Sequence, residues 1–431
     1  MTLLRVSVKV GCSIASALGR IPARLLAFVL LLTLTSVSQT AITPQMMSMS
    51  IGRENFSPTS APGNYWPPFS VGSIRLWDSN TAWEDLEVAP NSYRWDALNG
   101  WLNLAKSHGV TDVLYTFGSI PAWASGSSDT SCKYGPGTCY PPADVDSTDQ
   151  YWKDFITALV TTGKGRIKYY QFFNTPQDPT HWKGSVAQLM RMSQDAHDII
   201  RSLDPNAKIL SPPIGAYHVS VTNPCYIANK LQTWFFAPGG GSLVDIVSFN
   251  SYFTTNAEDV IPVIQCLVTM LKNYAQDTKP LWSTEGSWGS QTDLSNSTLQ
   301  SAFVARTYLV HASNRVVRFY WYGFNHSNWG VIWDPNTGLH PAGVAYKQVY
   351  NWVVGATLAT PCAHDSNNLW TCLLTRANGY QAQPTWITGA ATNYNVPAQY
   401  VSYRNLSGVK TAVPATRQIT IGSSPILLEN Q

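Results

Sequence analysis

The sequence predicts an α/β fold, a (β/α)8 TIM barrel followed by a small β-domain. Eight short runs that are apolar on both faces alternate with helical patterns over about 310 residues, as in a buried parallel sheet with helical crossovers. After Gly355 the helical periodicity stops, and Thr, Asn, Gly and Pro become frequent. We therefore expect a barrel domain at 45–355 and a small β-domain at 356–431.

The eight predicted strands are short runs that are apolar on both faces. The eight runs are 47–52, 73–78, 112–118, 167–174, 207–213, 245–252, 280–286 and 317–323. Between them, apolar residues recur at helical spacing, most clearly from 186 to 203 behind Ser185 as N-cap, and again in 260–271, 299–313 and 341–355. The first crossover, 53–72, looks irregular.

The first 38 residues have the pattern of a secretory signal peptide. The apolar run Leu25–Leu34 is followed by the small-x-small site at 36–38, and no acidic residue occurs before Glu54. The basic residues ahead of this run are Arg5, Lys9, Arg20 and Arg24. We expect a secreted, periplasmic or extracellular protein with no stable membrane span after cleavage. An uncleaved signal anchor is the alternative, although the run is short for a full span.

Composition points to a globular protein with an aromatic-lined site. Charged residues make up 12%, whereas there are 17 Trp and 21 Tyr. The formal charge of +3 becomes −1 when the four basic signal residues are subtracted. The sequence has no basic cluster and no phosphate-binding glycine loop, so we expect neither nucleic acid nor a nucleotide as partner. We expect no cofactor, and no metal, because no CxxC or His-rich spacing occurs.

The cysteines favour disulfides. Of 7 cysteines, Cys12 lies in the signal, which leaves an even set in an exported chain. Two pairs are close in sequence, 132/139 and 362/372, and 225/266 is the third predicted pair.

Candidate site residues lie where the predicted strands end, because barrel active sites form at the carboxyl ends of the strands. Glu285 closes an apolar strand, where a carboxylate is costly unless it is used or paired. We favour a functional role, and a structural ion pair with Arg75 is the alternative. The other residues at strand ends are Asn174, Thr175, Asn250, Tyr252, Thr284, Trp321 and Tyr322.

Tryptophans in the loops above could stack on sugar rings. Ordinary core packing is an equally good interpretation of any single one. They are Trp123, Trp182, Trp288, Trp329 and Trp333.

Several stretches together resemble the retaining clan A glycoside hydrolases, closest to the family 39 group. They are GSIRLWDSNTAWEDLEVAPNSYRW, VLYTFGSIPAWAS, IKYYQFFN, DPTHWKG, DIVSFNSY, KPLWSTEGSWG and RFYWYGFN. The resemblance implies that Glu285 is the nucleophile and that Tyr252 holds it. It further implies that Asn174 binds the sugar 2-hydroxyl and that Trp321 forms the floor of the subsite for the sugar being cut.

Strand four departs from the family pattern, which is roughly Tyr-Glu-hydrophobic-Trp-Asn-Glu-Pro. This chain has Gln171 and Thr175 in place of the two glutamates, and Asn250 stands where the family commonly has His. Retaining hydrolysis needs two carboxyl groups ~5–5.5 Å apart, and a threonine hydroxyl is far too weak an acid to replace one. Asp178 is the nearest substitute acid, and His181 is a weaker candidate.

Two functions on oligosaccharides or polysaccharides therefore remain open. One is a retaining β-glycosidase with a recruited acid. The other is an inactive protein that still binds β-linked glycans. A purely structural barrel is disfavoured, because Glu285, Asn174, Tyr252 and Trp321 are kept.

Overall fold

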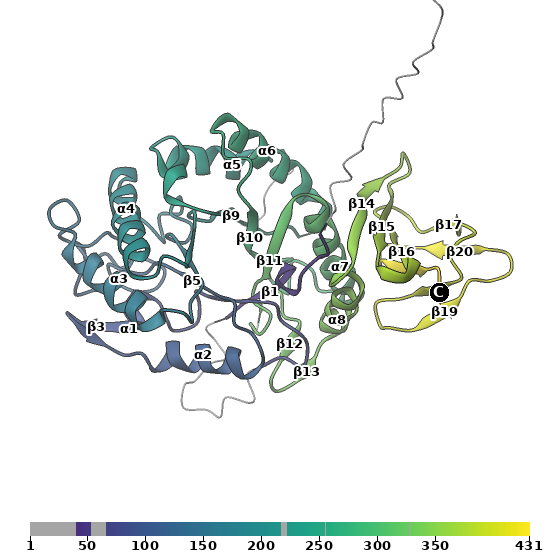
Figure 1. Cartoon of the computed structure of the whole chain (residues 1–431), viewed down its shortest axis with the longest axis horizontal. Coiled ribbons are helices and arrows are strands. Elements are labelled where there is room, and N and C mark those ends of the chain that lie inside the picture. Colours follow the sequence, from purple (N-terminus) through teal and green to yellow (C-terminus); the bar gives the residue numbers. More distant parts are fainter. Residues whose placement is uncertain (1–39, 53–65, 217–221, 255, 327) are drawn as a thin grey trace, which may run out of the picture. The chain divides into compact units, whose positions relative to one another are not determined.

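The computed structural model describes residues 40–52, 66–216, 222–254, 256–326 and 328–431 (Figure 1). Residues 39–431 form one compact unit. The predicted signal peptide lies outside the described residues. Within them, no helix combines the length and apolar character that a membrane span requires.

The barrel wall is a parallel sheet whose first and last strands pair. Its order is β7-β6-β5-β2-β1-β11-β10-β9-β8. The strands are β1 (Met47–Ser50), β2 (Ile74–Leu76), β5 (Val113–Thr116), β6 (Tyr169–Gln171), β7 (Lys208–Leu210), β8 (Ile214–Ala216), β9 (Val247–Ser251), β10 (Leu281–Gly286) and β11 (Val316–Trp321). Every predicted strand is present, although most are shorter than expected.

The fifth barrel strand is interrupted, which explains why the sheet has nine segments. β7 pairs with β6, and β8 pairs with β9, on either side of residues 211–213. Pro212 and Pro213 have no N–H to donate to a neighbouring strand, so the ladder breaks there. The segment 208–216 thus joins both edges, and the barrel closes as a (β/α)8 fold.

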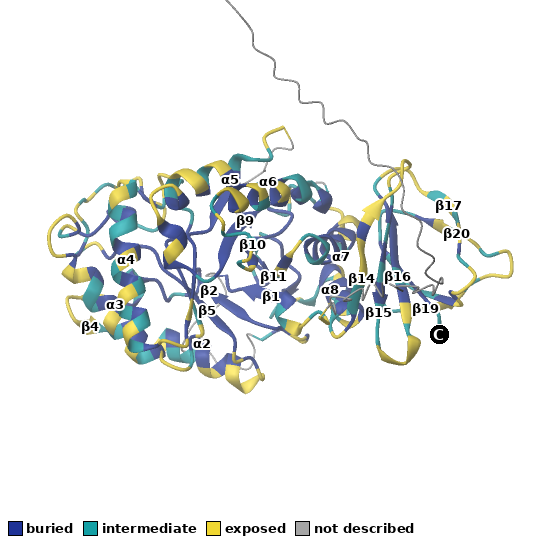
Figure 2. Ribbon diagram, turned by 45° about the horizontal axis from the view of Figure 1, so that its top comes forward, coloured by how far each residue is buried: buried dark blue, intermediate teal, exposed yellow. Residues whose placement is uncertain are grey.

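The helices cover the outside of this sheet. They are α1 (Trp83–Leu86), α2 (Asp96–Ser107), α3 (Gln150–Gly163), α4 (Val186–Leu203), α5 (Tyr226–Leu231), α6 (Val260–Asn273), α7 (Ser297–Ser313) and α8 (Pro341–Val353). Figure 2 shows the strands buried and the outward faces of the helices exposed. Ser185 caps α4 as predicted, since its hydroxyl accepts from the Gln188 N–H at 3.1 Å.

An antiparallel sheet begins at Thr357, after the last barrel helix. Its order is β14 (Thr357–His364), β15 (Leu369–Thr375), β16 (Gln381–Ile387), β21 (Ile426–Glu429), β18 (Ser402–Arg404) and β19 (Lys410–Ala412). A buried polar contact joins it to the barrel. Glu258, ion-paired with Arg306, accepts from Trp386 Nε1 at 2.7 Å.

The three predicted disulfides are confirmed. They join Cys132 to Cys139, Cys225 to Cys266, and Cys362 to Cys372. The first closes a short loop after β5, which brings Lys133 and Tyr134 to the mouth of the barrel. Three disulfides fit an extracellular protein.

Candidate active site

A cavity of ≈ 540 Å³ lies at the carboxyl ends of the strands. Its lining includes Trp77, Asp78, Lys133, Tyr134, Asn174, Thr175, Asp178, His181, Asn250, Tyr252, Glu285, Tyr322, His326 and Trp329. A larger cavity of ≈ 620 Å³ is lined by residues that precede β1, β2 and β5, at the opposite end of the barrel. We assign the site to the smaller cavity, because it holds the clustered carboxylates and lies where barrel enzymes build their active sites.

Glu285 is held at the cavity floor by a cation and a hydroxyl. Arg75 NH1 donates to Glu285 Oε2 at 2.8 Å, and the glutamate side chain is 13% exposed. The Tyr252 hydroxyl donates a short hydrogen bond to Oε1. Burial, followed by the charge of Glu285, raises the pKa of Tyr252 well above its ordinary value, so the hydroxyl keeps its proton. The functional and ion-pair interpretations of Glu285 are therefore compatible.

Arg75 connects the strands beneath the cavity. Its Nε donates to Thr116 Oγ1 and to Gln171 Oε1, both at 3.1 Å. Its NH2 donates to Asn174 Oδ1 at 2.7 Å. The guanidinium is fully buried, so these bonds fix both its plane and the carboxylate beside it.

The amide at position 171 is satisfied in this network. Gln171 Nε2 donates to Ser248 Oγ and Thr284 Oγ1, both at 2.9 Å, while Oε1 accepts from Arg75. An amide, unlike a carboxylate, can donate and accept at once. Gln171 therefore leaves Glu285 as the carboxylate paired with Arg75.

Asn174, Asn250 and Glu285 are brought together as the strand ends predict. Asn250 Nδ2 lies 3.3 Å from Asn174 Oδ1 and 3.4 Å from Glu285 Oε2. Asn250 Oδ1 accepts from Thr284 Oγ1 at 2.9 Å. Because the Thr284 hydroxyl holds the oxygen of the Asn250 amide, the Asn250 nitrogen is turned toward Asn174 and Glu285.

Thr175 follows Asn174 at the edge of the same cavity. Its φ of 42° is in the left-handed region, which is unusual for a β-branched residue. Its N–H donates to the Pro213 carbonyl at 3.1 Å, and its Oγ1 lies 3.5 Å from Asn174 Nδ2. The backbone at this position is therefore tied to the interrupted fifth strand.

Asp178 lines the cavity but is poorly suited to donate a proton. Its Oδ1 accepts from the N–H and the hydroxyl of Thr180, both at 2.8 Å, and His181 lies 3.4 Å from Oδ2. The hydrogen bond from His181 is the main cause that holds the pKa of Asp178 well below its ordinary value. An aspartate that is ionised at neutral pH has no proton to give to a leaving group. This environment argues against the predicted substitute acid.

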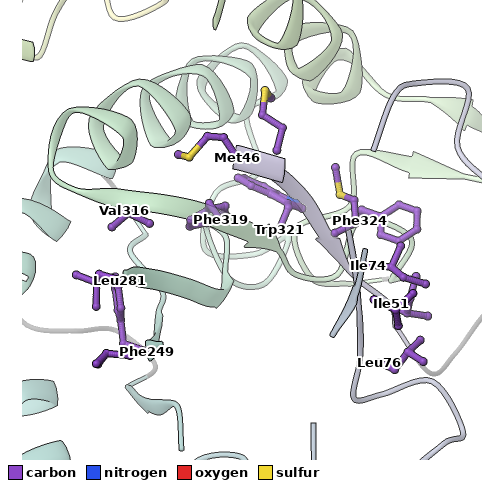
Figure 3. Close-up of a cluster of buried hydrophobic side chains, with 14 of the residues drawn as sticks. Met46, Ile51, Ile74, Leu76, Phe249, Leu281, Val316, Phe319, Trp321 and Phe324 are labelled. Atoms are coloured by element: carbon purple, nitrogen blue, oxygen red, sulfur yellow. The ribbon is translucent and has the colours of Figure 1, made fainter. Parts of the chain in front are cut away.

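Four tryptophans assigned to the site lie outside the cavity lining. Trp182, Trp288 and Trp321 are buried in the core, and Trp321 is 0% exposed. Figure 3 shows Trp321 among other buried apolar side chains. Half-buried Trp123 donates to the Glu87 carbonyl at 2.9 Å. The structure therefore contradicts the expectation that Trp321 forms the floor of the subsite, because this side chain packs in the core.

Strand alternation explains the position of Trp321. Tyr320 packs with residues inside the barrel, whereas Trp321 packs with Tyr308 of α7. The next residue, Tyr322, returns to the cavity side, and Trp329 joins it there.

The sequence analysis missed Asp78 as a site residue, and it placed Tyr322 at a strand end without assigning it a role. Asp78 closes the second apolar strand, and the rule that identified Glu285 would have found it. Tyr322 follows from extending the inside–outside alternation by one residue. Tyr134 depends on the Cys132–Cys139 loop, whose path no strand pattern predicts.

No protein-family model and no curated protein matches the sequence. Solved structures do match the fold of this chain. A family 39 glycoside hydrolase from the gut symbiont Bacteroides cellulosilyticus WH2 superposes with a TM-score of 0.69 at 16% identity, over 90% of this chain and 81% of the other. A GH39 β-xylosidase from Caulobacter crescentus gives 0.61 at 14% identity, over 91% and 97%.

A family 44 endoglucanase from Clostridium acetobutylium gives a TM-score of 0.55 at 13% identity, over 91% and 97%. These identities establish similarity of fold. The chain therefore has the fold of the family 39 glycoside hydrolases.

Proposed function

We propose that this chain binds β-linked glycans in the barrel mouth, with Glu285 poised as a nucleophile and no general acid for unactivated substrates. The arrangement of Arg75, Glu285 and Tyr252 carries the proposal. A carboxylate held by an arginine and a tyrosine at the floor of a cavity is directed toward a bound molecule. The proposed β-linkage rests on the neighbour that is named a β-xylosidase.

The missing function is acid–base chemistry. Thr175 occupies the position where the resemblance places the acid/base, and Asp178 is ionised at neutral pH. Natural glycosides have poor leaving groups that need protonation, and loss of a positioned acid typically slows such a step ~10²–10⁴-fold. The protein therefore acts chiefly as a glycan-binding protein.

The remaining chemistry depends on the leaving group. An aryl glycoside with an acidic phenol leaves without protonation, so Glu285 can attack the anomeric carbon and displace the phenolate. The glycosyl–Glu285 ester then accumulates, because no base activates water. Azide needs no base, attacks the same carbon and releases a glycosyl azide together with free Glu285.

The test compares wild type, Thr175→Glu and Glu285→Gln on dinitrophenyl β-xyloside and β-glucoside, with and without azide. We expect a burst of phenolate from wild type, turnover when azide is present, and no burst from Glu285→Gln. Thr175→Glu should restore part of the hydrolysis without azide. Intact mass spectrometry detects the ester directly. Rapid wild-type cleavage of unactivated oligosaccharides that Asp178→Asn abolishes would contradict the proposal and establish a recruited acid.

We further propose that the protein is exported by its first 38 residues. The three disulfides support this, because such bonds persist in oxidising compartments. N-terminal sequencing of the secreted chain tests it, with a new N-terminus near residue 39 expected.

A further inference from the structure

Asp78 is a second buried carboxylate in the same cavity, and the chemistry proposed above does not use it. It follows β2, is 9% exposed and lines the cavity. The Tyr134 hydroxyl donates to Asp78 Oδ1 at 3.1 Å, and the Tyr322 hydroxyl donates to Oδ2 at 2.7 Å. The two tyrosines come from different parts of the chain, the disulfide loop and the end of β11.

These contacts orient Asp78 through hydroxyl donors and supply no cation. Within the described ranges, Asp78 forms no ion pair with a Lys, Arg or His side chain, in contrast to Glu285. An ionised carboxylate offers about four acceptor positions, and the tyrosines occupy one on each oxygen. Burying a charge in this state is costly unless a bound group supplies further hydrogen bonds.

The Tyr322 donor keeps its proton at neutral pH. Burial, followed by the charge of Asp78, raises the pKa of Tyr322 well above its ordinary value. A protonated phenol donates to the carboxylate and keeps it from rotating. The free acceptor positions of Oδ1 and Oδ2 therefore have fixed directions.

Asp78 lies near the proposed reaction centre. The ring of Tyr322, its partner, meets the ring of Tyr252 at 6.2 Å and 86°. Tyr252 in turn donates to Glu285. The two carboxylates are thus linked through two adjacent tyrosines that line one cavity, so a sugar seated against Glu285 is within reach of Asp78.

We propose that Asp78, oriented by Tyr134 and Tyr322, accepts hydrogen bonds from two neighbouring hydroxyls of an uncharged glycosyl unit. This makes Asp78 a specificity-determining residue that selects neutral sugars and rejects uronates. The inference rests on the glycan-binding site proposed above. The Asp78 carboxylate is an anion with two directed acceptor oxygens. It therefore attracts a pair of hydroxyl donors and repels a sugar carboxylate.

The test measures binding rather than turnover. Methyl β-D-xyloside and its 2-, 3- and 4-deoxy analogues are titrated by NMR into wild type, Asp78→Ala and Asp78→Asn. We expect Asp78→Ala to weaken binding of the parent xyloside about 10- to 100-fold, the range for a hydrogen bond to a charged group. The analogue that lacks a contacted hydroxyl should bind wild type similarly weakly, with little further loss in Asp78→Ala.

Charge selection is tested with methyl β-D-glucoside and methyl β-D-glucuronide. Wild type should prefer the glucoside by at least about tenfold, and Asp78→Asn should reduce that preference. Asp198→Asn makes the same chemical change on the exposed face of α4 and serves as the matched control. Melting curves confirm that each variant is folded.

The outcomes separate the two proposals. If wild type binds none of these glycosides, the proposed function fails and this inference fails with it. If wild type binds them but the losses from Asp78→Ala and the deoxy analogues simply add, the inference alone is wrong. Preferential binding of glucuronide by wild type, or of a cationic amino sugar over the neutral glucoside, would also overturn it.

Discussion

Arg75 and Glu285 form an ion pair at 2.8 Å although 210 residues separate them in the chain. Arg75 belongs to the second barrel strand and Glu285 to the seventh. Closure of the sheet through β1 and β11 brings the two strands within reach across the barrel interior. The pair positions the proposed nucleophile and joins distant strands.

Removing Arg75 should destabilise the barrel. Arg75→Met leaves a mostly buried carboxylate without its cation, and the expected loss in the free energy of unfolding is ~3–5 kcal/mol. Guanidinium denaturation measures it. The double variant Arg75→Met/Glu285→Gln should recover part of the loss, because the unpaired charge is gone. If the loss in the double variant equals the sum of the losses in Arg75→Met and Glu285→Gln, the pair carries little coupling energy.

Trp321 and Trp329 should behave in opposite ways. Trp321→Ala removes a fully buried indole, with an expected loss in unfolding free energy of ~3–5 kcal/mol. Trp329→Ala removes a half-buried ring at the cavity and should leave the melting temperature nearly unchanged. It should weaken glycan binding by about 3- to 10-fold, the range expected for one aromatic contact. A stable Trp321→Ala variant with weakened binding would restore the role that the resemblance implied for Trp321.

Gln171→Glu should not be a neutral reversion to the family pattern. The hydroxyls of Ser248 and Thr284 accept from the Gln171 amide and donate to Ser211 O and Asn250 Oδ1. A glutamate offers them no proton, so at least one interaction is lost, at a cost of ~1–3 kcal/mol. Urea denaturation of Gln171→Glu beside Gln171→Met distinguishes a lost donor from lost packing. Unchanged stability of the glutamate variant would contradict the donor assignment.

Because Asp149 is buried, ionisation of its carboxyl group should lower the free energy of unfolding as pH rises. It is fully buried at the start of α3, its carboxylate oxygens have no donor among the described residues, and Asp195 is its neighbour. Burial, then the hydrogen bond and charge of Asp195, raise the pKa of Asp149 to about 8, from 3.8. The charge of Asp144 also raises the pKa of Asp149, and the charge of Arg191 lowers it. Lys153 forms an ion pair with Asp195.

The sign follows from proton linkage. The folded state binds the Asp149 proton more tightly than the unfolded state does. The contribution of Asp149 to the free energy of unfolding is therefore complete below pH 3.8 and is lost as pH rises to about 8. The slope is at most about 1.4 kcal/mol per pH unit. Asp149→Asn donates to Asp195 at every pH and tolerates the φ of 52°. The variant should gain stability over wild type above pH 8. Parallel stability–pH curves for the two proteins would show that Asp149 does not titrate in this way.

The sequence by itself determined the barrel and the floor of the site. Short runs that are apolar on both faces specify a buried parallel sheet, since water reaches neither face. Because the carboxyl ends of such strands meet at one end of the barrel, the sequence alone groups Glu285, Asn174, Asn250 and Tyr252. The cysteine spacings predicted two disulfides across short loops, 132/139 and 362/372, and left 225/266 as the third pair.

Only the tertiary structure decided which aromatic and acidic side chains face the cavity. Inside and outside alternate with each residue of a strand, so an error of one position turns Trp321 from a predicted sugar platform into core and leaves Tyr322 at the site. Loop contacts decided the rest. His181 and Thr180 hold Asp178 in its ionised form, and the disulfide loop brings Tyr134 to Asp78. These contacts join residues whose distance is set by the path of the loops, which local sequence patterns do not specify.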